Sequence, residues 1–269
     1  MSGRIDALLV CGGKFHDFDF ARLRLLELLA TDQRIRTQVA NDYEDLGALS
    51  ESDILVTYTC DVRPSMEAQV AMRDWVDKGG RVFALHATNS AFDAPPKLGA
   101  GLFETPDVFP VFAEMLGSRF LSHPAIEPYP VSVTPGKEDH PLVKGIGTFH
   151  ANDELYLSEF TADVEPLLET RWTGTTQGFA TAEWPVDEPR LVLYKRVLGK
   201  GAVLYFTLGH CRSHWDMKHA PFNGMRWPSI DRGSWELEEY NEILRRGLAW
   251  ACEPAIERVT ANPAPELGR

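Results

Sequence analysis

The chain has 269 residues, of which 44% are hydrophobic and 25% are charged, an ordinary balance for a soluble globular protein. Its formal net charge is −12, which argues against nucleic acid or an anionic membrane as a partner. None of the four cysteines forms a CxxC pair, and no apolar run is long enough for a signal peptide or a membrane span. We therefore expect a cytoplasmic protein with free thiols.

The first third of the chain alternates short apolar runs with amphipathic segments. Such runs, bounded by turns, are typical of parallel strands that are covered on both faces. The alternation predicts an α/β fold with a doubly wound, mainly parallel sheet and helices on both faces. The expected strands are Ile5 to Cys11, Ile35 to Ala40 (more polar, nearer the sheet edge), Asp53 to Thr59 and Val82 to Leu85, and the expected helices are Asp19 to Ala30 and Ser65 to Lys78.

A nucleotide cofactor is not expected, although the first strand is followed by a glycine turn and a helix. The turn Gly12-Gly13-Lys14-Phe15-His16-Asp17 lacks the GxGxxG fingerprint and has bulky residues where a pyrophosphate would approach.

The rest of the chain adds strands and two further helices. A short helix is expected over Phe109 to Leu116, a glycine hairpin over Leu198 to Gly201, and a last helix over Trp235 to Ala251. We predict a single domain over residues 1–254, followed by a partly disordered tail over 255–269.

Polar side chains follow several of the buried strands. In open α/β sheets the ligand crevice lies beyond the carboxyl ends of the strands. His86 stands there, as do His16 and Cys60, and His210 ends a later apolar strand. The second half of the chain adds His123, Asp153 and Glu154. Each taken alone has an ordinary structural explanation, but two histidines at buried strand ends point to a shared site.

Two kinds of chemistry suit these residues. A divalent metal such as Zn²⁺ would take His86, His123 and His210 as ligands and polarise a carbonyl or activate water. Without a metal, His86 and His210 with Asp153 and Glu154 would transfer protons next to a carbonyl. The sequence has no HExxH spacing.

A polar, aromatic loop over Cys211 to Ser234 favours a sugar as the small-molecule substrate. Aromatic faces interleaved with amide and charged groups suit the stacking and hydrogen bonding of a polyhydroxylated ring. We expect Arg212, Trp215 and Asn223 to bind the substrate, together with His16 and Cys60.

Several motifs resemble those of the ThuA-like (trehalose utilisation) proteins. The resemblance implies a flavodoxin-like sheet related to class I glutamine amidotransferases, and a link to sugar catabolism. The motifs, spread over roughly residues 5–252, are Gly12 to Asp17, His86-Ala87, Leu116 to Pro124, Asp139 to Ile146, Asn152 to Tyr156 and Gly199 to His210.

Compared with those amidotransferases, two of three catalytic positions are changed. His86 stands at the position of the cysteine nucleophile, and His210-Cys211-Arg212 keeps the later histidine but loses its glutamate. An imidazole cannot form the thioester, so glutamine hydrolysis is disfavoured.

The leading hypothesis is an enzyme that acts on trehalose or a related sugar or keto-sugar by acid–base or metal-assisted chemistry. The alternative is a non-catalytic sugar-binding or regulatory protein on the same scaffold. A third hypothesis is a thiol enzyme that uses Cys60 or Cys11. A homo-oligomer is compatible with each of them.

Overall fold

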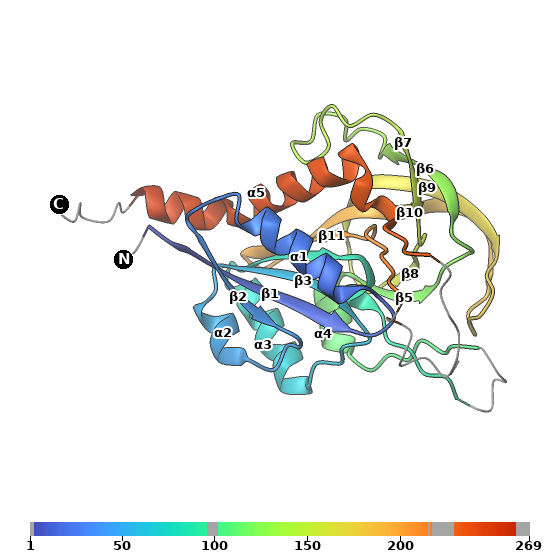
Figure 1. Cartoon of the computed structure of the whole chain (residues 1–269), viewed down its shortest axis with the longest axis horizontal. Helices are drawn as coiled ribbons and strands as arrows, with labels where there is room; N and C mark the ends of the chain where they lie inside the picture. Colours follow the sequence, from blue (N-terminus) through green and yellow to red (C-terminus); the bar gives the residue numbers. More distant parts are fainter. Residues whose placement is uncertain (1–2, 96–101, 215, 217–228, 262–269) are drawn as a thin grey trace.

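The computed structural model describes residues 3–95, 102–214, 216 and 229–261. A twisted nine-stranded sheet runs through the molecule, with helices on both of its faces (Figure 1). The strand order is β2-β1-β3-β4-β11-β10-β9-β6-β7, and a separate two-stranded sheet joins β5 and β8. Within these ranges no helix has the length and apolar character needed to cross a bilayer.

The first half of the sheet is parallel, as the sequence predicts. Its order 2-1-3-4, closed by β11, is that of flavodoxin-like sheets. The inner strands are buried on both faces, whereas the edge strand β2 is mostly half-buried or exposed. The strands are β1 (Ile5–Gly13), β2 (Ile35–Ala40), β3 (Ile54–Cys60), β4 (Arg81–Leu85) and β11 (Gly201–Phe206).

The second half of the sheet is antiparallel, so the sheet is mixed rather than mainly parallel. The change of direction occurs at the predicted hairpin, where Gly199 has φ 57° and joins β10 to β11. Two neighbouring strands joined by a tight turn must run antiparallel, which sets the direction of β10 against β11. These strands are β10 (Glu183–Leu198), β9 (Glu165–Thr175), β6 (Glu127–Val133) and β7 (Phe149–Asp153), with β5 (Ser118–Ser122) and β8 (Leu157–Phe160) in the small sheet.

Each face of the sheet has its own hydrophobic core. Helices α1 and α5 cover one face, and α2, α3 and α4 cover the other (Figure 1). The predicted cap of α3 is present, since the Ser65 hydroxyl accepts a hydrogen bond from the Ala68 N–H at 3.2 Å. The helices are α1 (Phe18–Leu29), α2 (Leu46–Glu51), α3 (Met66–Asp77), α4 (Pro110–Leu116) and α5 (Glu238–Ala261), with 3-10 turns η1 (His86–Asn89) and η4 (Gly233–Glu236).

The last helix differs from the sequence-based expectation at both ends. Trp235 lies in η4, and α5 continues through Pro254 to Ala261, so the predicted tail over 255–269 begins inside a helix. A proline removes one helical hydrogen bond, but Ala255 and Ile256 still contact the core on that side. Burial of these side chains offsets the loss.

Helix α5 approaches the sheet closely at Gly247. A Cβ atom there would collide with the ring of Phe83 in β4. In an exposed helix Gly→Ala gains about 1 kcal/mol, whereas overpacking a core costs about 1–3 kcal/mol. We expect Gly247→Ala to lower the free energy of unfolding by up to about 2 kcal/mol in urea denaturation, because the cost of overpacking outweighs the gain in helix propensity.

The control is Ala249→Gly at an exposed position of the same helix. It should cost about 1 kcal/mol through propensity alone. A Gly247→Ala protein that is more stable than the wild type would show that α5 does not pack against β4 in this way.

Candidate functional site

Three residues with positive φ surround the carboxyl ends of the parallel strands. Phe15, Asp61 and His86 have φ values of 70°, 54° and 47°, each just past the end of β1, β3 or β4. A left-handed backbone costs a residue with a side chain roughly 1–2 kcal/mol. Such strain persists only where surrounding contacts impose it, and it concentrates at functional sites.

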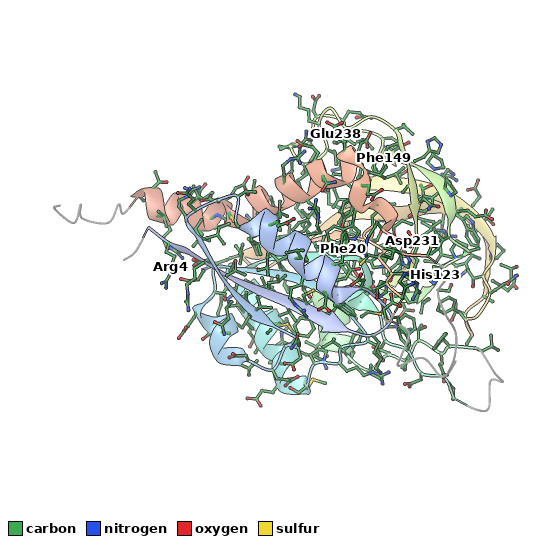
Figure 2. The ribbon with its side chains drawn as sticks, in the orientation of Figure 1. Arg4, Phe20, His123, Phe149, Asp231 and Glu238 are labelled. Atoms are coloured by element: carbon green, nitrogen blue, oxygen red, sulfur yellow. The ribbon has the colours of Figure 1, made fainter. Side chains whose placement is uncertain are left out.

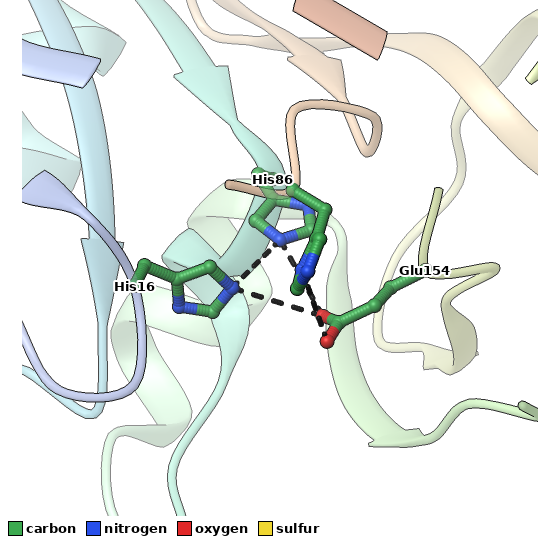
Figure 3. A group of neighbouring side chains, drawn as sticks. His16, His86 and Glu154 are labelled. Carbon is green, nitrogen blue, oxygen red and sulfur yellow. Dashed lines mark hydrogen bonds and ion pairs between the residues drawn. The ribbon is translucent and has the colours of Figure 1, made fainter. Parts of the chain in front are cut away.

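Three imidazoles converge in this crevice, as Figure 3 shows for two of them. The Nε2 atoms of His16 and His86 lie 2.9 Å apart. The ring centroids of His16 and His210 are 5.5 Å apart, and those of His86 and His210 are 5.9 Å apart. All three side chains are buried, so the predicted pairing of His86 with His210 is present and His16 joins it.

Backbone carbonyls set the proton positions on two of these rings. His86 Nδ1 donates to the Thr207 carbonyl at 2.8 Å, and His16 Nδ1 faces the Lys14 carbonyl at 3.3 Å. A neutral imidazole has only one N–H, so with both bonds made the two Nε2 lone pairs point at each other. Either one of the two rings carries its proton on Nε2 and gives up its carbonyl, or a cation lies between the rings.

Glu154 closes the cluster from the opposite side (Figure 3). Its Oε2 lies 3.7 Å from His16 Nε2 and 3.5 Å from His86 Nε2. Its Oε1 lies 3.1 Å from His210 Nδ1. Among the described residues, neither ring nitrogen of the buried His210 side chain has a partner with hydrogen-bond geometry. The contact with Glu154 is therefore an ion pair by its distance only.

Asp153 has a different environment from its neighbour Glu154. Its Oδ2 accepts from the backbone N–H groups of Gly209 at 3.0 Å and Ser234 at 3.1 Å. Its Oδ1 accepts from those of Glu154 at 2.8 Å and His210 at 3.1 Å. The sequence assigns Asp153 and Glu154 the same catalytic role. In the structure Asp153 instead ties together the backbone segments that carry Glu154 and His210.

The electrostatics of the cluster keep Glu154 ionised. Burial raises the pKa of Glu154, but the imidazoles of His210 and His123 lower that pKa by more, and the result is well below the usual range. Burial lowers the pKa of His210, but the Glu154 carboxylate raises it by more, so the net shift is upward. Burial lowers the pKa of His16 to about 3, so this ring is neutral at pH 7.

The four side chains His16, His86, His210 and Glu154 fit a metal ion. Each offers a ligand atom, and these atoms all lie within 4.8 Å of one another. Ligand atoms of tetrahedral Zn²⁺ lie about 3.3 Å apart, because Zn–N bonds are about 2.0–2.1 Å long. The contacts of 2.9, 3.5 and 3.7 Å around the Nε2 pair lie on both sides of that value. Among the described residues neither ring nitrogen of His210 has a hydrogen-bond partner, which suits a metal ligand. In His16 and His86 the Nδ1 atom faces a carbonyl, an arrangement that leaves Nε2 as the ligand atom.

His123, expected as a ligand, lies at the edge of this group rather than in it. Its Nδ1 donates to the Pro124 carbonyl at 2.7 Å, and its Nε2 lies 3.7 Å from Glu154 Oε1. His16, expected among the substrate-binding residues, takes its place.

The expected substrate-binding residues have different outcomes. Arg212 and Cys60 both line the cavity of about 80 Å³ beside His16 and Glu154. Arg212 Nη2 is 3.7 Å from Glu154 Oε1. Trp215 and Asn223 lie outside the described residues.

Sequence reasoning missed Tyr156. Its hydroxyl lies 3.5 Å from His86 Nε2 and 3.4 Å from Glu154 Oε2. In an extended segment side chains alternate, so a residue two positions after Glu154 shares its side. The spacing of two residues from Glu154 is the feature of the sequence that could have indicated Tyr156.

The thiols in this region are poorly suited to nucleophilic chemistry. All four cysteines are free and buried. Burial raises the pKa of Cys60 well above its usual value, and it raises that of Cys11 to about 12. The reactive species is the thiolate, which these environments disfavour.

Solved structures with the same arrangement of elements include two ThuA-like proteins. The one from Parabacteroides merdae is 17% identical, with a TM-score of 0.64 over 93% of this chain and 91% of that one. The one from Bacteroides uniformis is also 17% identical, with a TM-score of 0.59 over 93% and 92%. A β-galactosidase from Rahnella sp. R3 is 15% identical, with a TM-score of 0.52 over 98% of this chain but 33% of that one.

Fold and crevice together define a mixed α/β protein with a buried histidine–carboxylate cluster at the strand ends. The sequence model of the ThuA family, described as trehalose utilisation, matches residues 7–227. The chain therefore belongs to the ThuA family. No curated protein is a significant match.

Removing one imidazole should weaken metal binding by the cluster. We expect His86→Asn to weaken Zn²⁺ binding by about 100-fold or more, since loss of even an indirect partner of a ligand costs 10–100-fold. Asparagine suits the left-handed backbone at this position. The measurement is metal content after purification without a histidine tag, followed by Zn²⁺ titration of the apo-protein.

His150→Ala is the matched control, because His150 lies on β7 but is exposed. It should bind Zn²⁺ like the wild type. Equal Zn²⁺ affinity in wild type and His86→Asn would contradict a metal site here.

Alkylation should leave the cavity thiol unmodified. Because burial raises the pKa of Cys60, the thiolate fraction is very small at pH 7.5 and grows only as the pH rises towards that pKa. We expect iodoacetamide at pH 7.5 to leave Cys60 intact in peptide mass spectrometry of the folded protein. Rapid labelling of Cys60 with loss of activity would revive the thiol-enzyme hypothesis.

Proposed function

We propose that this protein is an enzyme of sugar utilisation that acts on trehalose or a related sugar or keto-sugar. Membership of a family described as trehalose utilisation supports the substrate class. The convergence of His16, His86, His210 and Glu154 in one buried crevice supports the chemistry, and it is the observation that carries the proposal. The reaction is acid–base chemistry at a sugar carbonyl or hydroxyl, assisted by a divalent metal ion such as Zn²⁺.

Each side chain has a distinct part in this scheme. His16, His86, His210 and Glu154 would hold the ion, and an ion that accepts a further ligand would polarise a substrate oxygen. The pKa of Tyr156 is raised well above its usual value, chiefly by burial, so its hydroxyl keeps its proton and donates to that oxygen. Arg212 adds positive charge on the Glu154 side of the cavity.

Glutamine hydrolysis is not part of this function. His86, not a cysteine, occupies the strained position after β4, and the neighbouring thiols are kept protonated by burial. Four free thiols also suit a reducing compartment, so we propose a cytoplasmic location. A homo-oligomer stays a prediction.

Tyr156→Phe should separate turnover from metal binding. The substitution removes only the hydroxyl, so Zn²⁺ content should be unchanged while kcat for trehalose or its keto derivatives falls by about 10²- to 10⁴-fold. Glu154→Gln should instead lose both the metal and the activity. The measurements are product formation by chromatography and metal content.

Tyr43→Phe removes a hydroxyl that bonds to Thr57 and Thr59 and is absent from the residues lining the cavity. It should lower the melting temperature but keep kcat. Sugar-induced stabilisation of the wild type without any product would instead favour the non-catalytic sugar-binding alternative.

A further inference from the structure

A second hollow lies next to the histidine cluster. It is a cleft of about 510 Å³, whereas the cavity beside Glu154 has about 80 Å³. A water molecule occupies about 30 Å³ of liquid, so the cavity takes roughly two or three water-sized groups and the cleft roughly seventeen. The cavity is therefore too small for a sugar ring, whereas the cleft falls within the range of small-molecule sites.

One short segment of chain separates the two hollows. Glu154 and Tyr156 line the cavity, and Leu155 between them lines the cleft. His123 lines both hollows. The His123 Nδ1 donates to the Pro124 carbonyl, and its Nε2 lies 3.7 Å from Glu154 Oε1. His123 is therefore a wall that the cleft shares with the cavity beside the cluster, and its place in the fold is labelled in Figure 2.

The walls of the cleft combine an aromatic face with polar groups. Trp172 of β9 is half-buried there, and its indole packs against Gly174. Gln177 and Glu127 supply an amide and a carboxylate. The Tyr129 hydroxyl is buried, with no hydrogen-bond partner among the described residues. A hydroxyl buried in this way is not reached from the cleft, so Tyr129 contributes its ring rather than its hydroxyl to the wall.

We propose that this cleft binds the non-reacting ring of a disaccharide whose reacting ring presents one edge, past His123, to the histidine cluster. Trp172 stacks on the C–H face of the distal ring, and Gln177 and Glu127 bond its hydroxyls. The cleft has room for a whole sugar ring and its bound water, whereas the cavity beside Glu154 does not. This assignment rests on the proposed function and adds to it the size of the substrate.

The test compares trehalose with glucose by isothermal titration calorimetry on the full-length, Zn²⁺-loaded protein. We expect trehalose to bind at least 10-fold more tightly than glucose, because only the disaccharide contacts Trp172 and the histidine cluster at the same time. Trp172→Ala should weaken trehalose binding at least 10-fold with unchanged Zn²⁺ content, and Trp172→Phe should restore part of the affinity. Trp250→Phe, on α5 and absent from the cleft lining, should bind trehalose like the wild type.

Two results would overturn the assignment: no trehalose binding to the wild type, or trehalose affinity that is unchanged in Trp172→Ala. Its failure is distinguishable from that of the metal-assisted mechanism. Trehalose binding that depends on Trp172 in a protein that takes up no Zn²⁺ would keep the cleft and remove the mechanism. Normal Zn²⁺ binding in a protein whose trehalose affinity does not depend on Trp172 would keep the mechanism and remove the cleft assignment.

Discussion

The burial of the Glu154 carboxylate is the constraint on which the crevice depends. Its side chain is 5% exposed, and taking such a charge out of water costs several kcal/mol. The surrounding imidazoles and Arg212 compensate for that cost, and the low pKa of Glu154 expresses this balance. The compensating groups come from the ends of β1, β4 and β11, so the carboxylate ties three strands of the parallel half to the antiparallel half.

Asp153 makes this arrangement rigid. Its two oxygens accept backbone hydrogen bonds from the segments after β7 and β11 and from η4. Fixing the backbone at Glu154 and His210 fixes where their side chains point, which is what a metal or a substrate oxygen needs. The strained backbone of His86 has the same effect, because the left-handed turn after β4 directs its ring into the crevice.

Much of the crevice follows from the sequence because carboxyl ends of parallel strands share one edge of the sheet. This rule brings His16, His86 and His210 together without knowledge of the coordinates. It does not distinguish Asp153 from Glu154, because adjacent residues point to opposite sides and the sequence does not say which side faces the crevice. The sequence also does not show that His123 lies at the edge of the cluster, since its ring is oriented by the carbonyl of the next residue.

In the fold, too, elements set by local sequence patterns are predictable, and those set by contacts between distant segments are not. Apolar runs and caps place the inner strands and α3, whereas the antiparallel half depends on the pairing of segments distant in sequence. The extension of α5 past Pro254 depends on core contacts at Ala255, which outweigh local helix propensity. The cleft could not be predicted, because Trp172, Tyr129 and Leu155 come from different strands and connections.

Anomalous diffraction at the zinc edge, from crystals grown with Zn²⁺, tests the central claim most directly. We predict one strong peak within about 2.0–2.2 Å of the Nε2 atoms of His16 and His86, of a ring nitrogen of His210 and of a Glu154 oxygen. A map with no peak in the crevice, and with His16 Nε2 hydrogen-bonded to His86 Nε2, would contradict it.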